Sequence, residues 1–140
     1  MSDLPKNDLS NPNKSSLSVL LVDDDAFQID LISEILRGLD IINISPASSG
    51  EKALQMLKAG ASGYQLILLD LHMPGMDGFQ FMESATRLGY KGGLIIVSGQ
   101  SEDVVHAATL VATLRRFKLL GSIVKPVQRS ELSALIAPLR

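Results

Sequence analysis

The chain has 140 residues, of which 46% are apolar, 20% are charged and 4% are aromatic, and it contains neither cysteine nor tryptophan. This length suits one compact domain, and the lack of cysteine excludes disulfide scaffolds, cysteine-based metal sites and a cysteine nucleophile. The formal charge of −2 argues against nucleic acid or an anionic membrane as the main partner, because both bind basic surfaces.

Residues 1–16 are expected to form a flexible N-terminal leader. They are rich in Ser, Asn, Asp, Lys and Pro and have no hydrophobic period, so they would bury too little surface to offset their ordering entropy. A partner-binding tail is the alternative. The leader lacks the apolar core of a signal peptide, and no apolar run approaches the ~18 residues of a membrane span, so a cytoplasmic location is the default.

From residue 17 onward, short apolar runs alternate with segments of helical period. In chain order they predict five pairs of a strand and a helix: Leu17–Val22 and Ala26–Leu39, Ile41–Ser45 and Gly50–Ala59, Tyr64–Leu69 and Gly78–Leu88, Gly93–Val97 and Glu102–Lys118, Gly121–Val124 and Ser130–Leu139. The first, third and fourth strands are nearly continuous Val, Ile and Leu, which is typical of parallel strands covered on both faces. The alternation predicts an α/β fold with a doubly wound five-stranded parallel sheet and five helices, for which the usual strand order is 2-1-3-4-5.

The first predicted helix has an apolar face and a clear beginning. Phe27, Leu31, Ile35 and Leu39 recur at four-residue steps, with Ile32 and Leu36 alongside, which makes one side of the helix apolar. Asp25 precedes the helix and is a plausible N-cap.

Polar residues follow the apolar strands at the carboxyl ends, where open α/β sheets bind their ligands. Asp23, Asp24 and Asp25 follow the first strand, and Asp70 follows the third. Carboxylates held this close repel one another unless a cation neutralises them, and Mg²⁺ is the simplest candidate because it prefers oxygen ligands. Helix capping is the alternative role for one or two of the three consecutive aspartates.

Two further strand ends and one loop complete the candidate site. The loop Leu71–Gly78 (LHMPGMDG) is rich in proline and glycine, which favours a rigid backbone beside Asp70. Ser98 offers a hydroxyl donor, Gly99 allows close approach of the backbone, and Lys125 offers a positive charge on a long stem. Individually, Ser98 and Lys125 would pass for a turn residue and a solvated strand end. Together with a nucleophilic carboxylate and a divalent ion, they suit phosphoryl transfer to an aspartate.

These residues resemble the receiver domain of two-component response regulators, which has a flavodoxin-like fold. The resemblance covers residues 17–140 and is carried by LLVDDD, LILLDLHMPGMDG, IIVSG and GSIVKP, in that order. It implies that Asp70 is phosphorylated by the phosphohistidine of a sensor histidine kinase or phosphotransfer protein. It implies further roles: Mg²⁺ ligation by Asp23, Asp24, Asp70 and the backbone carbonyl of His72, phosphoryl contacts by Ser98, Gly99 and Lys125, and a cis peptide at Lys125–Pro126.

The resemblance also implies in-line attack by the Asp70 carboxylate, with Mg²⁺ and Lys125 offsetting charge on the phosphoryl oxygens. The acyl phosphate would later be lost to water. His72 and Gln100 flank the expected water path, so we predict that they tune the lifetime of the phosphorylated state.

Two features depart from the common receiver pattern. Ser122 stands where many receivers carry an aromatic residue that swings inward on activation, so that route of signal transmission is lacking. The long helix Glu102–Lys118 is apolar beyond one stripe, which indicates either additional core or a surface for a second copy or an effector. Its SGQSED start is similar to receivers fused to EAL-type cyclic-di-GMP phosphodiesterase domains.

The rival function is a haloacid-dehalogenase-type phosphatase, which also forms an aspartyl phosphate. Asp23 and Asp25 would supply its D-x-D pair, but Phe27 replaces the usual Thr or Val and the late acidic motif is missing. The receiver interpretation therefore predicts a signalling module that catalyses only its own phosphorylation and dephosphorylation. The sequence predicts either a stand-alone receiver or the front part of a larger regulator.

Overall fold

The computed structural model describes residues 17–99 and 102–140. The predicted leader and Gln100 therefore lie outside the described residues. Five parallel strands form one sheet in the order β2-β1-β3-β4-β5, which confirms the predicted doubly wound, flavodoxin-like α/β fold. The strands are β1 (Ser18–Val22), β2 (Asn43–Ala47), β3 (Leu66–Asp70), β4 (Gly93–Ser98) and β5 (Lys118–Val124).

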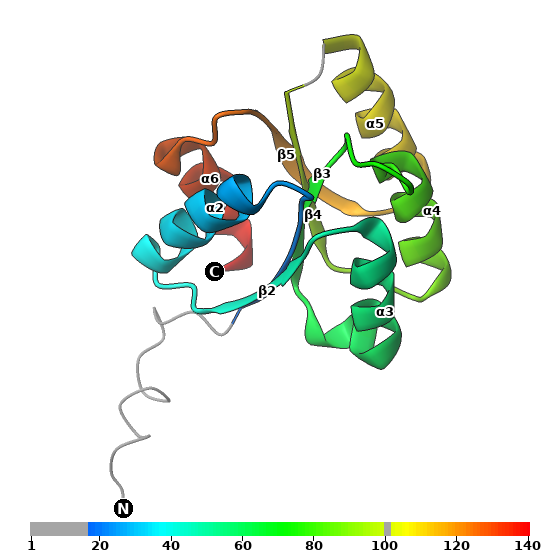
Figure 1. Cartoon of the computed structure of the whole chain (residues 1–140), viewed down its shortest axis with the longest axis horizontal. Coiled ribbons are helices and arrows are strands. Elements are labelled where there is room, and N and C mark those ends of the chain that lie inside the picture. Colours follow the sequence, from blue (N-terminus) through cyan, green and yellow to red (C-terminus); the bar gives the residue numbers. More distant parts are fainter. Residues whose placement is uncertain (1–16, 100–101) are drawn as a thin grey trace, which may run out of the picture.

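Five α-helices cover the two faces of the sheet (Figure 1). They are α2 (Ala26–Gly38), α3 (Gly50–Gly60), α4 (Gly78–Arg87), α5 (Glu102–Leu114) and α6 (Arg129–Ile136), with short 3-10 turns at Ala61–Gly63 and Ala137–Leu139. The helices α2 and α6 pack on one face, and α3, α4 and α5 pack on the other. Residues of β1, β3 and β4 alternate between the two resulting apolar layers, which explains their continuous Val, Ile and Leu.

Three helices end in the same hydrogen-bonded motif. After α2, α4 and α5, one residue adopts a left-handed conformation, namely Asp40, Gly89 and Arg116 with φ of 66°, 87° and 63°. The N–H of the next residue, which is apolar or aromatic and buried, then bonds back to the last helical turn (Ile41 to Leu36, Tyr90 to Ala85 and Phe117 to Ala112). This pattern is a Schellman motif, in which the buried residue fixes the end of the helix.

The motif after α5 corrects the prediction of a helix over Glu102–Lys118. The helix ends at Leu114, and Lys118 already belongs to β5, which begins three residues before the predicted Gly121. The strand predicted at Ile41–Ser45 was also wrong by two residues. Ile41 closes the end of α2, and β2 continues through Pro46, which is tolerated because β2 is an edge strand.

Side-chain caps fix the beginnings of α2 and α4, which follow the loops of the candidate site. The Asp25 carboxylate accepts a hydrogen bond from the N–H of Phe27, which confirms the predicted N-cap. The Phe27 side chain, however, is 68% exposed in the first turn of α2, and the residues of this helix that are buried are Ile32, Ser33 and Leu36. Asp77 and Gln80 form a reciprocal capping box at the start of α4.

Within the described ranges, no helix has both the length and the apolar character needed to cross a membrane.

Candidate functional site

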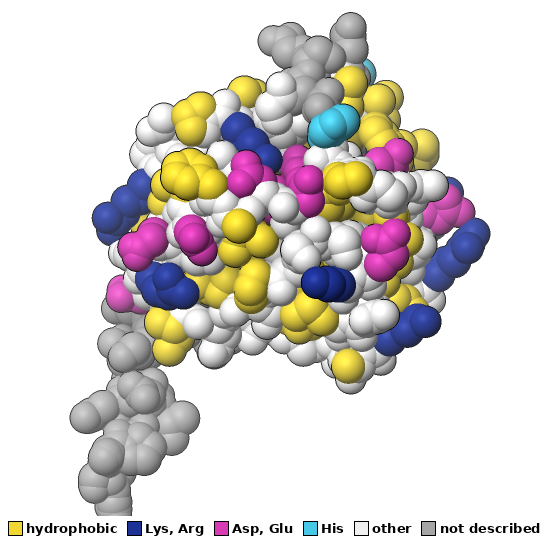
Figure 2. All heavy atoms as spheres, in the orientation of Figure 1, with side chains coloured by type: hydrophobic (Ala, Val, Ile, Leu, Met, Phe, Trp, Pro, Cys, Tyr) yellow, Lys and Arg dark blue, Asp and Glu magenta, His cyan; other side chains and the backbone are white. Residues whose placement is uncertain are grey.

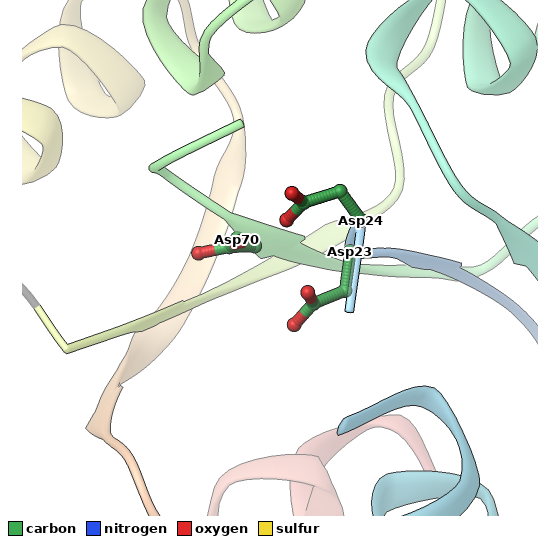
Figure 3. Close-up of side chains that lie close together, drawn as sticks. All are labelled: Asp23, Asp24 and Asp70. Carbon is green, nitrogen blue, oxygen red and sulfur yellow. The ribbon is translucent and has the colours of Figure 1, made fainter. Parts of the chain in front are cut away.

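Three carboxylates converge at the carboxyl ends of β1 and β3 (Figure 3). Asp23 and Asp70 are nearly buried, with 1% and 4% of their surface exposed, whereas Asp24 is exposed. One oxygen from each of the three carboxylates lies within 4.8 Å of the other two. On the molecular surface, acidic side chains gather at the top of the visible face, close to a histidine (Figure 2).

The third consecutive aspartate does not join this cluster. Asp25 uses its carboxylate to cap α2, and its backbone N–H donates a 2.9 Å hydrogen bond to Oδ1 of Asp23. The run of three aspartates therefore divides into two residues of the acidic cluster and one cap. Capping and clustering, which were alternatives for this run, are both present.

Lys125 reaches the cluster from the end of β5. Its Nζ donates a hydrogen bond of 2.9 Å to Oδ2 of Asp23 and lies 3.6 Å from Oδ1 of Asp70. The ammonium is therefore closer to Asp23 than to Asp70. The backbone N–H of Lys125 donates to the carbonyl of Ser98, which ties the ends of β4 and β5 together, and the Lys125–Pro126 peptide is cis.

The surroundings of these groups alter their proton affinities. Burial and the negative charge of Asp23 raise the pKa of Asp70 from 3.8 to about 6, although Lys125 and the N–H of His72 act in the opposite direction. Partial burial lowers the pKa of Lys125, but its hydrogen bond to Asp23 and the charges of Asp70 and Asp23 outweigh this effect and raise it. The site therefore holds more negative charge than its lysine compensates.

The loop after Asp70 places backbone groups beside its carboxylate. The N–H of His72 donates a 3.2 Å hydrogen bond to Oδ1 of Asp70, while the residue itself is exposed. The loop closes where the N–H of Gly78 bonds to the carbonyl of Leu71. A Cβ at Gly78 would lie 2.9 Å from Cα of Leu71, so only glycine allows this close approach of the two ends of the loop.

The remaining predicted residues also lie at this edge of the sheet. Ser98 is the last residue of β4 and is fully buried, and Asp70 pairs in register with Val97 on the same strand. Gly99 follows at the surface, and no atom lies within 4 Å of the position that a Cβ there would occupy. Ser122 is exposed on β5, in agreement with the absence of an inward-facing aromatic side chain at that position.

Residues 19–137 match the family model of the response regulator receiver domain, and the chain belongs to this family. Among curated relatives, it is 27% identical over 126 residues to the chemotaxis protein CheY of Treponema pallidum, covering 90% of this chain and 84% of that protein. It is 32% identical over 98 residues to the nitrate/nitrite response regulator NarL of Escherichia coli, covering 68% of this chain and 44% of that protein. The family assignment gives no support to the phosphatase alternative.

Solved structures show the same fold. The CheX–CheY–BeF₃–Mg²⁺ complex from Borrelia burgdorferi matches with a TM-score of 0.76 at 23% identity, covering 88% of both chains. A response regulator from Colwellia psychrerythraea matches with a TM-score of 0.75 at 26% identity, covering 89% of this chain and 97% of that one.

The chain is a receiver domain of two-component response regulators, and such domains are signalling modules that interact with histidine kinases or phosphotransfer proteins. Several relatives are much longer than this chain. It spans 14% of the two-component response regulator ARR2 of Arabidopsis thaliana and 22% of a protein-glutamate methylesterase of Treponema pallidum.

Proposed function

We propose that Asp70 accepts a phosphoryl group from the phosphohistidine of a sensor histidine kinase or phosphotransfer protein. The observation that carries this proposal is the buried Asp70 carboxylate, which ends β3 with Asp23, Asp24 and Lys125 around it. An Asp70 oxygen forms the new bond to phosphorus while the bond from phosphorus to the donor imidazole breaks. In this proposal, Lys125, Ser98 and the backbone beside Gly99 would contact the transferred oxygens.

The same cluster has the donor set for Mg²⁺. Asp23, Asp24 and Asp70 offer carboxylate oxygens close together, and hard oxygen ligands are those that Mg²⁺ prefers. We propose that these three residues and the backbone carbonyl of His72 hold the ion. When bound, Mg²⁺ would supply positive charge to the phosphoryl oxygens.

The test is phosphorylation by a small donor. Incubation with acetyl phosphate and Mg²⁺ is expected to add one phosphoryl group to the wild-type protein and none to Asp70→Asn, as measured by intact-protein mass spectrometry. Asp40→Asn is the matched control, because Asp40 is exposed and asparagine tolerates its left-handed backbone. Equal labelling of Asp70→Asn and the wild type would contradict the proposal.

The lifetime of the phosphorylated state is expected to depend on His72. This residue is exposed, and its backbone N–H bonds to the Asp70 carboxylate. His72→Ala should change the rate of phosphoryl loss severalfold while Mg²⁺ binding is retained, and we propose the same tuning role for Gln100. Timed mass spectra after removal of the donor measure the rate, with His106→Ala on α5 as the control; the idea fails if His72→Ala and wild type lose the group equally fast.

We further propose that α5 contacts a second copy or an effector. Leu110 and Leu114 lie one turn apart and are 52% and 79% exposed, whereas Ala108 and Ala112 are buried and Val104 and Val111 pack against the core. Apolar side chains outside the core favour a contact surface over additional core. Sedimentation velocity with acetyl phosphate and Mg²⁺ is expected to reveal self-association that Leu114→Ser weakens. A monomer under all conditions would contradict contact with a second copy.

The proposed boundaries are a leader at residues 1–16 and the receiver domain at residues 17–140. The similarity to receivers with EAL-type output domains stays a prediction.

A further inference from the structure

A cavity lies at the end of the sheet that is opposite to Asp70. It has a volume of about 400 Å³ and is formed where β3, β4 and β5 begin, between the 3-10 turn at Ala61–Gly63 and the turn that follows α4. We propose that this cavity binds a small organic dianion, either a dicarboxylate or a phosphate ester.

The charge of the cavity carries the proposal. Lys91 and Lys118 both line it, and no acidic residue does. Within residues 17–99 and 102–140, neither ammonium group has an ion pair or a hydrogen bond. Two cations at one cavity without an acidic residue in its lining attract an anion that carries two negative charges.

The backbone of the cavity adds hydrogen-bond donors on a fixed support. The Tyr90 hydroxyl donates 2.7 Å to the carbonyl of Gly93, and the N–H of Gly93 donates 2.9 Å to the carbonyl of Gln65. These bonds hold the turn from Gly89 to Gly92 against the sheet. In the described part of the chain, the N–H groups of Lys91 and Gly92 have no acceptor, so they remain available to an anion.

The other side chains indicate the size and character of the ligand. Tyr64 and Leu139 line the cavity and present an aromatic ring and an aliphatic side chain, which suit a short carbon skeleton. The volume is at the lower end of small-molecule sites. A compact molecule with two negative charges fits this lining better than an extended apolar one.

The cavity is separate from the proposed phosphorylation site. The strand β4 runs from Gly93 at the cavity to Ser98 at the site, a span of about 17 Å at the rise of a parallel strand. The ligand would therefore bind without displacing a phosphoryl group from Asp70. The inference does not rest on phosphorylation of Asp70.

The test is a nuclear magnetic resonance titration of the isotope-labelled chain. Succinate and glycerol phosphate are added separately, without Mg²⁺ and at constant ionic strength, while backbone amide shifts are followed. We expect saturable shifts at Gly89, Lys91, Gly92 and Gly93 with one of the probes, which identifies the carboxylate or the phosphate class. The double variant Lys91→Ala/Lys118→Ala should weaken this binding about tenfold, as expected for the loss of two exposed charge contacts.

Two control variants test whether binding depends on the lysines of this cavity. Lys52→Ala/Lys58→Ala removes two lysines from α3 and should leave the affinity unchanged. Asp70→Asn should also leave it unchanged, because the cavity is at the other end of β4. Shifts that do not saturate with either probe, or an equal loss of affinity in the α3 double variant, would overturn the proposal.

Discussion

Replacement of Lys125 by methionine is expected to lower the free energy of unfolding of the metal-free domain by about 3 kcal/mol at neutral pH. Methionine keeps much of the aliphatic stem but removes the charge that lies 2.9 Å from Asp23. Asp23 would then be a buried carboxylate without a cation, and breaking a buried pair in this way costs about 3–5 kcal/mol. We expect the lower end of this range because the Lys125 side chain remains 20% exposed.

Urea denaturation in the presence of a chelator measures this effect, and Lys58→Ala on α3 is the surface control, expected to change stability by less than about 0.5 kcal/mol. Saturating Mg²⁺ should recover much of the loss in Lys125→Met, because the ion would supply positive charge to the same carboxylates. Unchanged stability in the metal-free variant would mean that Lys125 does not compensate Asp23.

Asp70→Asn is expected to have the opposite effect and to stabilise the metal-free domain at pH 7–8, by about 3 kcal/mol at most. The pKa of Asp70 rises from 3.8 to about 6 on folding, so the folded state binds a proton more tightly than the unfolded state does. The stability that Asp70 contributes is therefore fully present below about pH 4 and is lost as the pH rises through about 6. Asparagine has no charge to bury, so the advantage of the variant should shrink as the pH falls through this window.

Unfolding curves at pH 4.5, 6 and 8 in chelator would measure this difference, with Asp40→Asn as the exposed control. Mg²⁺ should reduce the difference in free energy of unfolding between the variant and the wild type at pH 8, because it binds the wild-type carboxylates more tightly than the variant site. If the difference in free energy of unfolding between Asp70→Asn and the wild type does not vary with pH, the effect does not arise from burial of the Asp70 charge.

The sheet and its order could be predicted because buried parallel strands leave a strong local pattern. The Val, Ile and Leu runs of β1, β3 and β4 are buried on both faces, as their composition indicated. The end of α5 could not be predicted in this way. Arg116 adopts the left-handed conformation that glycine usually supplies, and the signal for it is the buried Phe117 that follows, which in the sequence continues the apolar pattern of a helix.

The convergence of the site residues followed from topology, but their pairing did not. Asp23, Asp24, Asp70 and Lys125 meet because the carboxyl ends of parallel strands share one edge of the sheet. In the folded chain, Asp25 is the cap of α2 and Asp23 is the nearer partner of Lys125. Both outcomes depend on backbone angles and side-chain positions that the sequence does not display.

The contact between Lys125 and Asp23 joins residues that are 102 positions apart. During synthesis, the segment with Asp23 and Asp70 therefore leaves the ribosome long before the lysine that compensates its charge. Until β5 has paired with β4, the three carboxylates lack that cation. Pairing of β5 brings Lys125 to the carboxylates and also forms the hydrogen bond from its backbone N–H to the carbonyl of Ser98. A nascent chain interrupted before this strand would carry Asp23 and Asp70 without the ammonium group that lies beside them in the complete fold.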